Sequence, residues 1–529
     1  MRALIGVDIG TQGSKGALIS ESGHVLATHS IEQTMTIPRP GWAEHDADGV
    51  WWAGFVEIVR TLLLRSQVDP EQISGIGVSS LMPVMVPVDS DGRAVRPAIS
   101  YTDSRAHAEM IAMNVELADV GETPLVGHDI GPKMIWFRDH EPVNWRRTRM
   151  FTGAQGHVIA RLTGRYVIDS ITASGMRPFF DFKTRDWDVL HCDRHDIPIA
   201  MLPEVVEMTD VIGAVTEEAA AETGLAAGTP VIGGATDFIA ELISTGADQP
   251  GDVVVSYGTT LCLGVFSRQP IAPWPGGGSM LRAGSDLARL YPDLHAVGAG
   301  MATSGALTRW FRDQFGQGER RVEQELGINA YSLLALEAEA TPPGADGLVV
   351  LPYFGGERTP IYDDQARGVI FGLTLSHGRA HIYRALLEGV AYGLQHNLDL
   401  IREAGASPRR IVATGGGSRS ALWTQIVSDV TGLPQEVIAP SNAALGAAFL
   451  AGYARGIFRH IGDVRQWAQA EREVRPRDEV HSLYQRHYAV YRRLYERTKE
   501  EMHELAGLSD VALDAPPRSA VPSHATQAM

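Results

Sequence analysis

The hydrophobic pattern at the start of the chain predicts a β-hairpin with a glycine-rich turn. Leu4, Ile5 and Val7 form an apolar run that is typical of a buried strand, and an acidic residue, Asp8, follows at its end. Residues 10–15 are punctuated by glycine and predict a turn, after which the apolar pattern resumes as a second strand. A third strand of the same sheet is expected further along, over residues 25–34.

The same pattern returns in the middle of the chain. Residues 253–267 read VVVSYGTTLCLGVFS, which is again a strand, a Gly-Thr turn and a strand. When Gly10 is placed on Gly258, Val7 falls on Val255. Internal repetition of this kind predicts two related domains, each presenting one hairpin turn.

Other periodic segments complete an α/β pattern. Asp48 is expected to cap a helix that begins near Val50. Further strands are expected at 73–78, 230–232 and 411–414, and further helices from Ile239 onward, over 379–400 and over 421–431.

The two predicted turns suit a polyphosphate. Glycine lets the backbone approach an anion closely, and backbone N–H groups, hydroxyls and a lysine supply donors. Neither turn is a Walker A loop, because each joins a strand to a strand. Asp8 stands where a carboxylate can hold Mg²⁺, which prefers oxygen ligands. The candidate phosphate-binding residues are Thr11, Gln12, Ser14, Lys15, Gly258, Thr259 and Thr260.

Composition narrows the class of protein. The 529 residues allow two or more sizeable cores, and the net charge of −17 argues against a nucleic-acid or anionic-membrane partner. No signal-peptide pattern is evident, and no run approaches the roughly 18 apolar residues of a membrane span. The two cysteines show no metal or disulfide spacing. We therefore expect a cytoplasmic protein.

Longer motifs in the second half are the most specific. Residues 355–360 read GGERTP, and residues 368–388 read GVIFGLTLSHGRAHIYRALLE. The segment 127–137 (GHDIGPKMIWF) is a less regular companion. Together with the two hairpins, these motifs make the chain resemble the FGGY family of carbohydrate kinases over nearly its whole length.

The resemblance implies two actin-like (ribonuclease H-like) ATPase domains with an active-site cleft between them. The expected boundaries are 1–247 for the N-terminal domain, 248–506 for the C-terminal domain, and 507–529 for a disordered tail. It also implies that ATP is the phosphoryl donor and that Mg²⁺ assists. Homodimers are common in the family.

Residue roles follow from the same resemblance. Asp237, in the run GGATDF, corresponds to the catalytic base and is a second candidate ligand for Mg²⁺. A helix beginning at this residue is expected to lower its pKa, although an acid in this position could instead serve only as a helix cap. The sugar-binding candidates are Met82, Tyr101, Asp103, Arg105 and Asp237, and an exposed loop ion pair is the alternative for Asp103 and Arg105. The further nucleotide-binding candidates are Gly305, Arg309, Gly415, Gly416 and Ser420.

The acceptor is expected to be a small-molecule sugar or polyol. The overall pattern is most similar to xylulokinases, which points to a pentulose such as D-xylulose. However, Leu81-Met82-Pro83 and Tyr101 depart from the xylulokinase pattern, so other polyols, ribulose and aldonates stay open. Two other classes share the architecture: actin-like chaperone or filament ATPases, and sugar sensors without kinase activity.

Overall fold

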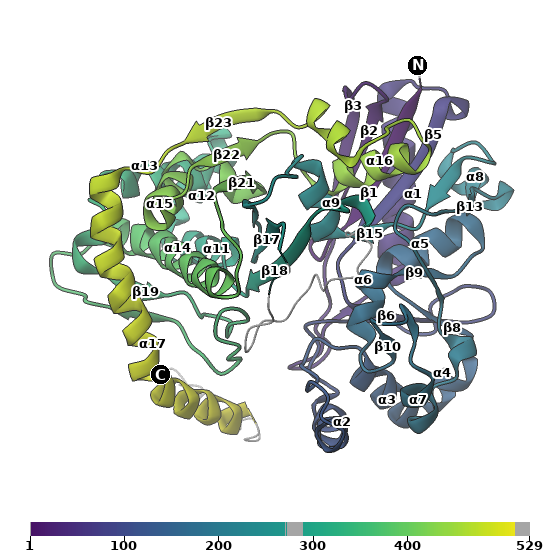
Figure 1. Ribbon diagram of the computed structural model, residues 1–529, viewed down its shortest axis with the longest axis horizontal. Coiled ribbons are helices and arrows are strands. Elements are labelled where there is room, and N and C mark those ends of the chain that lie inside the picture. Colours follow the sequence, from purple (N-terminus) through teal and green to yellow (C-terminus); the bar gives the residue numbers. More distant parts are fainter. Residues whose placement is uncertain (1, 270, 272–288, 514–529) are drawn as a thin grey trace, which may run out of the picture.

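The computed structural model describes residues 2–269, 271 and 289–513, and it has two lobes joined side by side (Figure 1). The N-terminal half forms one lobe, drawn in purple and blue, and most of the C-terminal half forms the other. Each lobe contains a mixed β-sheet with helices packed against it. The predicted α/β class with two actin-like domains is therefore confirmed at the level of architecture.

The N-terminal sheet contains the first predicted hairpin. Its order is β13-β14-β5-β1-β2-β3, with β15 also pairing to β5. β1 is antiparallel to β2, which places Asp8 opposite Lys15, and parallel to β5 on its other side. The strands are β1 (Ala3–Ile9), β2 (Gly13–Ser20), β3 (Val25–Glu32), β5 (Ile73–Ser80), β13 (Val211–Ala214), β14 (Pro230–Ile232) and β15 (Ala235–Thr236).

The C-terminal sheet repeats this arrangement. Its order is β18-β17-β16-β21-β22-β23, in which β16 is antiparallel to β17 and parallel to β21. The set β5-β1-β2-β3 in one sheet thus corresponds to β21-β16-β17-β18 in the other, as the sequence repeat predicts. The strands are β16 (Asp252–Tyr257), β17 (Leu261–Ser267), β18 (His295–Met301), β21 (Arg410–Thr414), β22 (Gln435–Ile438) and β23 (Ala470–Val474).

Smaller sheets complete the lobes. A four-stranded sheet of order β4-β7-β6-β8 lies in the N-terminal lobe, and residues 101–105 follow its strand β7 directly. The remaining strands are β4 (Glu44–His45), β6 (Val84–Val88), β7 (Ala98–Ser100), β8 (Met150–Thr152), β9 (Val167–Asp169), β10 (Phe180–Asp181), β11 (Asp186–Trp187), β12 (Glu204–Val206), β19 (Val349–Leu351) and β20 (Val369–Phe371).

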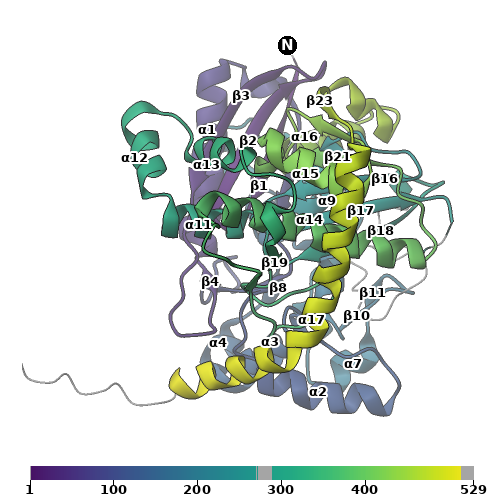
Figure 2. The same ribbon diagram turned by 90° about the vertical axis from the view of Figure 1, so that its left-hand side faces the viewer.

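Helices cover these sheets in both lobes (Figures 1 and 2). Those of the first half are α1 (Ala53–Ser66), α2 (His107–Asp119), α3 (Gly131–His140), α4 (Pro142–Arg147), α5 (Ala154–Thr163), α6 (Ser170–Ala173), α7 (Val189–Arg194), α8 (Glu217–Thr223) and α9 (Asp237–Ser244). Those of the second half are α11 (Gly305–Phe315), α12 (Gln317–Leu326), α13 (Ala330–Glu339), α14 (Arg379–Glu403), α15 (Ala421–Thr431), α16 (Ala443–Ala454) and α17 (Asp478–Leu513).

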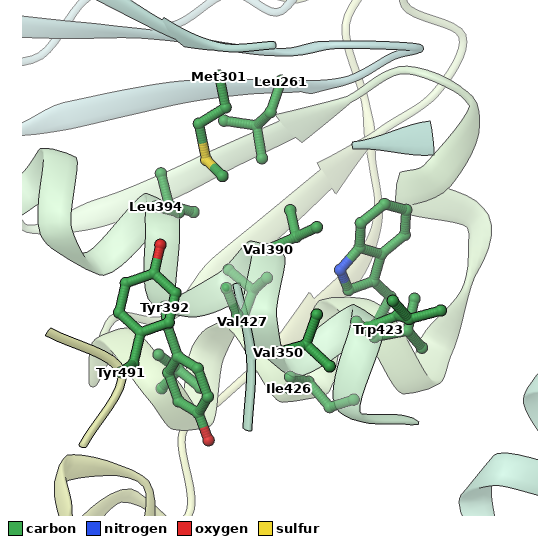
Figure 3. Close-up of a cluster of buried hydrophobic side chains, with 14 of the residues drawn as sticks. Leu261, Met301, Val350, Val390, Tyr392, Leu394, Trp423, Ile426, Val427 and Tyr491 are labelled. Carbon is green, nitrogen blue, oxygen red and sulfur yellow. The ribbon is translucent and has the colours of Figure 1, made fainter. Parts of the chain in front are cut away.

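The core of the C-terminal lobe lies between its sheet and helices α14 and α15 (Figure 3). Val390 and Leu394 of α14 are buried with Ile426 and Val427 of α15. Burying an aliphatic side chain of this size contributes about 1.5–3 kcal/mol, which explains why these helices form from an apolar stripe at helical spacing.

Two details differ from the sequence prediction. Helix α1 is preceded by a π-helical turn, Ala47–Trp52, and Asp46 rather than Asp48 caps that turn by accepting a hydrogen bond from the Gly49 amide. Helix α17 continues to Leu513, so residues 507–513, predicted as part of a disordered tail, are helical. The rest of that predicted tail, 514–529, lies outside the described residues.

The two lobes share a core at their junction. Helix α16, although late in the sequence, packs against β1 and β5 of the N-terminal sheet and against α9. This approach requires glycine: a Cβ atom on Gly6 would lie 1.9 Å from the Ala444 carbonyl oxygen, and one on Gly446 would lie 1.7 Å from the Ala240 carbonyl oxygen. The junction therefore holds α9 between the two sheets, and α9 is the helix that begins with Asp237.

Candidate active site

The first turn is fixed by its own backbone and by one glutamine. The Gly10 amide donates to the Gly13 carbonyl at 3.1 Å, and the Gln33 side-chain amide donates to the Gly10 carbonyl and, at 3.1 Å, to the Ser14 hydroxyl. Ser14 is buried, so its hydroxyl supports the turn. Thr11, Gln12 and Lys15 remain partly or fully exposed and are the residues that the turn presents.

The second turn, 258–260, supports the start of helix α11. The Gly305 amide donates to the Gly258 carbonyl at 2.9 Å, and the Ala306 amide donates to the Thr259 carbonyl at 3.0 Å. A Cβ atom on Gly305 would lie 2.6 Å from the Gly258 carbonyl oxygen, so glycine is required at this point. The structure therefore brings together the predicted nucleotide-binding residues Gly258, Thr259 and Gly305.

One hydrogen bond joins the first turn to helix α11 of the other lobe. Arg309, one helical turn after Gly305, donates from Nη1 to Oε1 of Gln12 at 2.7 Å. Residues 297 positions apart in the sequence thus meet, and both were predicted to bind the nucleotide.

The third segment predicted to bind the nucleotide, residues 415–420, contains both tightly packed and open positions. Gly415 has φ +84° and lies against the backbone of Tyr257, whereas a Cβ atom on Gly416 would meet nothing within 4 Å. The Ser420 hydroxyl caps helix α15 by accepting from the Trp423 amide at 3.3 Å. Gly416 is therefore the position of this segment that leaves open space.

The charge of Asp237 acts on the carboxyl group of Asp8. Asp8 ends β1 and accepts a hydrogen bond from the Ser79 hydroxyl at 3.0 Å. Burial raises the pKa of Asp8 to about 8, and the negative charge of Asp237 contributes to this increase. The two acids, which are far apart in the sequence, therefore lie close enough in space for the charge of Asp237 to act on Asp8.

Asp237 is not the helix cap. The Thr236 hydroxyl caps α9 by accepting from the Ile239 amide at 3.3 Å, which leaves Asp237 as the first residue of the helix. The expectation of a lowered pKa is wrong: burial raises the pKa of Asp237 to about 6, because it outweighs the hydrogen bond from the Phe238 amide and the positive charge of Arg358. A pKa near 6 leaves this carboxylate mostly ionised at pH 7.

The structure adds two charged residues that the sequence analysis did not assign. Arg358 donates from Nη2 to the Met301 carbonyl at 3.0 Å, and its charge lowers the pKa of Asp237 and of Tyr101. Glu241 lies one turn after Asp237 on α9 and accepts hydrogen bonds from Ser256 and Thr414. The GGERTP motif contains Arg358, and the i, i+4 spacing from Asp237 was the available signal for Glu241.

The predicted sugar-binding loop is held by a buried ion network. Asp103 and Arg105 are buried, so the expectation of an exposed ion pair is wrong. Oδ1 of Asp103 accepts from the amide and Nε of Arg105, and Oδ2 accepts from the Ala43 amide and from Nη2 of Arg105. These bonds occupy the acceptor capacity of the carboxylate. Asp103 therefore orients Arg105.

One donor group of Arg105 is left without a partner in this network. Its Nη2 also donates to Glu44 at 2.7 Å, and its guanidinium lies 3.6 Å from the ring centroid of Trp42. Its Nη1 is buried and has no hydrogen-bond partner. Met82 and Tyr101 are both half-buried, and burial raises the pKa of Tyr101.

Two negative findings apply to residues 2–269, 271 and 289–513. Within these ranges no helix is long and apolar enough to cross a membrane. Among the same residues, no group of three or more His, Cys, Asp and Glu side chains is placed to hold a metal ion by itself.

The duplicated hairpin domains and the two acids at the lobe junction fit the actin-like ATPase fold that the sequence predicts. Family models agree: the N-terminal domain of the FGGY family of carbohydrate kinases matches residues 3–244, and its C-terminal domain matches residues 253–455. The chain belongs to the FGGY family of carbohydrate kinases. It is accordingly a carbohydrate kinase, and ATP is the phosphoryl donor that kinases of this family use.

The chain is similar both to xylulose kinases and to gluconokinases. It is 28% identical to a xylulose kinase of Bacillus subtilis over 94% of this chain and 98% of the relative. It is 30% identical to a gluconokinase of the same organism, over 86% and 88% respectively. The crystal structure of a xylulose kinase from Rhodospirillum rubrum superposes with a TM-score of 0.79 at 32% identity, covering 95% of this chain and 100% of that one.

Proposed function

We propose that this carbohydrate kinase transfers the γ-phosphate of ATP to a primary hydroxyl of a pentulose, with D-xylulose as the leading acceptor and Asp237 as the base. The observation that carries the proposal is the position of Asp237. It opens α9 at the lobe junction, close enough to Asp8 for its charge to act there, and it is partly exposed. Similarity to xylulose kinases supports the choice of acceptor.

The proposed chemistry uses the chain's own groups for positioning and proton transfer. The triphosphate lies between the turns 11–15 and 258–260, whose backbone and hydroxyl donors bind its oxygens. Asp237, ionised at neutral pH, accepts the proton of the attacking hydroxyl as that oxygen forms its bond to the γ-phosphorus and the bond to the β–γ bridging oxygen breaks. The positive charge of Arg358 acts on Asp237 and favours its ionised form.

The acids at the junction fit a divalent cation. Burial and the charge of Asp237 raise the pKa of Asp8 to about 8, more than the Ser79 hydrogen bond and the charge of Lys15 lower it, so a cation at this position would favour the ionised carboxylate. Asp8 and Asp237 would hold Mg²⁺, with phosphate oxygens and water as its other ligands. When bound, the ion neutralises charge on the phosphates.

A second acceptor class is favoured by one specific observation. Arg358 forms a hydrogen bond to a backbone carbonyl and no ion pair with any carboxylate among the described residues, and its charge acts on both Tyr101 and Asp237. A guanidinium with free donors suits a carboxylate, which an aldonate carries and a pentulose lacks. Similarity to gluconokinases supports this alternative.

The test is a coupled assay of ADP release across pentuloses, hexuloses, polyols and aldonates. D-xylulose is expected to give the highest kcat/KM, and an aldonate optimum would replace it with the second acceptor class. ADP release that is independent of any acceptor would contradict the proposal.

A further inference from the structure

Glu241 places one carboxylate between the helix of the proposed base and both nucleotide-binding strands of the other lobe. It accepts a hydrogen bond from the Ser256 hydroxyl at 2.9 Å and another from the Thr414 hydroxyl at 3.1 Å. Ser256 lies in β16, just before the turn 258–260, and Thr414 ends β21, just before Gly415. A single side chain therefore contacts the strand that leads into each turn.

The contact reaches Asp237 through one turn of helix. Glu241 follows Asp237 by four residues on α9, so the two side chains share a helix face and their Cα atoms are separated by about 6 Å along the axis. A helical turn is stiff on this scale. A shift of β16 or β21 against Glu241 would therefore move Asp237 relative to the bound phosphates.

A second chain of hydroxyls closes the connection. Ser244, also on α9, lies 2.9 Å from the Ser441 hydroxyl, and Ser441 lies 2.8 Å from the Thr414 hydroxyl. Glu241 is the charged member of this ring, and hydrogen bonds to a carboxylate are roughly twice as strong as neutral ones. Burial raises the pKa of Glu241 while the two hydroxyls lower it.

We propose that Glu241 is a positioning residue that sets the distance between the base and the γ-phosphate by holding α9 against β16 and β21. This inference rests on the proposed function of Asp237 and of the two turns. In this role Glu241 does not touch the substrate. The two turns are held by their own backbone hydrogen bonds, and Glu241 only fixes their position relative to α9. The role predicts an effect on kcat that exceeds any effect on KM.

The primary test compares Glu241→Ala, Glu241→Gln and Thr414→Val in steady-state kinetics. Glu241→Ala is expected to lower kcat about 10- to 100-fold, with both KM values within about threefold of wild type, because small displacements of reacting groups are costly. Glu241→Gln is expected to recover at least a third of wild-type kcat, because its amide both donates and accepts while hydroxyls can do either. Combining Glu241→Ala with Thr414→Val is expected to add little to the single changes.

Arg465→Ala is the matched control. Arg465 lies beyond the C-terminal end of α9, where its Nε donates to the Gly246 carbonyl at 3.2 Å and its guanidinium pairs with Asp248. This variant is expected to keep wild-type kcat. Melting temperatures of all variants show whether a loss of kcat follows from unfolding.

The outcomes separate this inference from the proposed function. A wild-type enzyme with no acceptor-dependent ADP release would contradict the proposed function itself. An active wild type together with an unchanged kcat in Glu241→Ala would overturn the inference alone. A rise in both KM values in proportion to lost stability would also overturn it, because a general structural role would then explain the effect.

Discussion

Arg309 and Gln12 form a hydrogen bond of 2.7 Å between helix α11 of one lobe and the first turn of the other. The bond connects two segments that lie 297 residues apart in the sequence. Because the Gln12 side chain is exposed and neutral, the bond is expected to contribute only about 1 kcal/mol to the free energy that holds the two segments together. The bond connects the first turn to the helix that packs, through Gly305 and Ala306, against the second turn of the proposed triphosphate site.

Removing this bond is expected to weaken nucleotide binding. Arg309→Ala should raise KM for ATP about three- to tenfold, since it removes one charged donor and loosens the approach of the two turns. Steady-state kinetics at saturating acceptor measure the change. Arg321→Ala, which removes an exposed ion pair on α12, should leave that KM unchanged; equal effects of both variants would contradict a specific role for Arg309.

A methyl group at position 305 is expected to displace the second turn. In Gly305→Ala the added carbon would meet the Gly258 carbonyl oxygen at 2.6 Å, so the turn 258–260 or α11 must move. KM for ATP should rise at least tenfold. Gly318→Ala is the matched control, because a Cβ atom there meets nothing within 4 Å and alanine favours the helix. Wild-type kinetics in Gly305→Ala would contradict this prediction, because they would show that the turn and α11 accommodate the added carbon without any effect on ATP binding.

Arg358 offers a separate test of the acceptor side. Arg358→Ala is expected to lower kcat/KM for the acceptor about 10- to 100-fold, the range for losing hydrogen bonds to a charged group. Arg358→Lys should recover only part of the loss, because an ammonium lacks the planar fork of donors. An assay with each acceptor measures both. An unchanged kcat/KM in Arg358→Ala would remove this residue from the acceptor site.

Buried histidines are expected to make stability depend on pH. Burial lowers the pKa of His45 to about 4, and that of His396 to about 3, below the unfolded value near 6.5. Each group binds a proton in the unfolded chain first, so the stability it contributes is complete above pH 6.5 and is lost as pH falls toward the folded pKa. For His45 the loss near pH 4 is about 3 kcal/mol.

The corresponding measurement is thermal unfolding at pH 7 and pH 5. Wild type should lose melting temperature between these values, and His45→Gln should lose less. His24→Gln, at an exposed position, should behave as wild type. A pH dependence in His45→Gln identical to that of wild type would contradict the assignment to His45.

The sequence predicted the parts of the fold that repeat or follow a strict period. Apolar spacing predicted both hairpins and the helix over 421–431. The offset between Gly10 and Gly258 predicted that the two distant turns occupy corresponding places in two related domains. The insertion of α16 beside β1 could not be read in this way. It depends on small residues at 6 and 446 whose meaning appears only once two distant segments are packed together.

The same limit applied to the site. Residue types and motifs led to Asp8 and Asp237, but the direction of the pKa of Asp237 depends on burial, which outweighs the helix terminus. Asp103 was read as a sugar ligand because a carboxylate can bind hydroxyls, yet its acceptors are taken by Arg105 and Ala43. Competition for hydrogen-bond partners is a three-dimensional property that spacing does not reveal.

The most direct test of the central claim is the rate of phosphoryl transfer in Asp237→Asn. The amide keeps the shape of the side chain and can still accept from the Phe238 amide, but it cannot take up the proton of the acceptor hydroxyl. Calorimetry should show binding of ATP and acceptor, while kcat falls at least about a hundredfold. Turnover at the wild-type rate in a folded Asp237→Asn enzyme would contradict the assignment of Asp237 as the base.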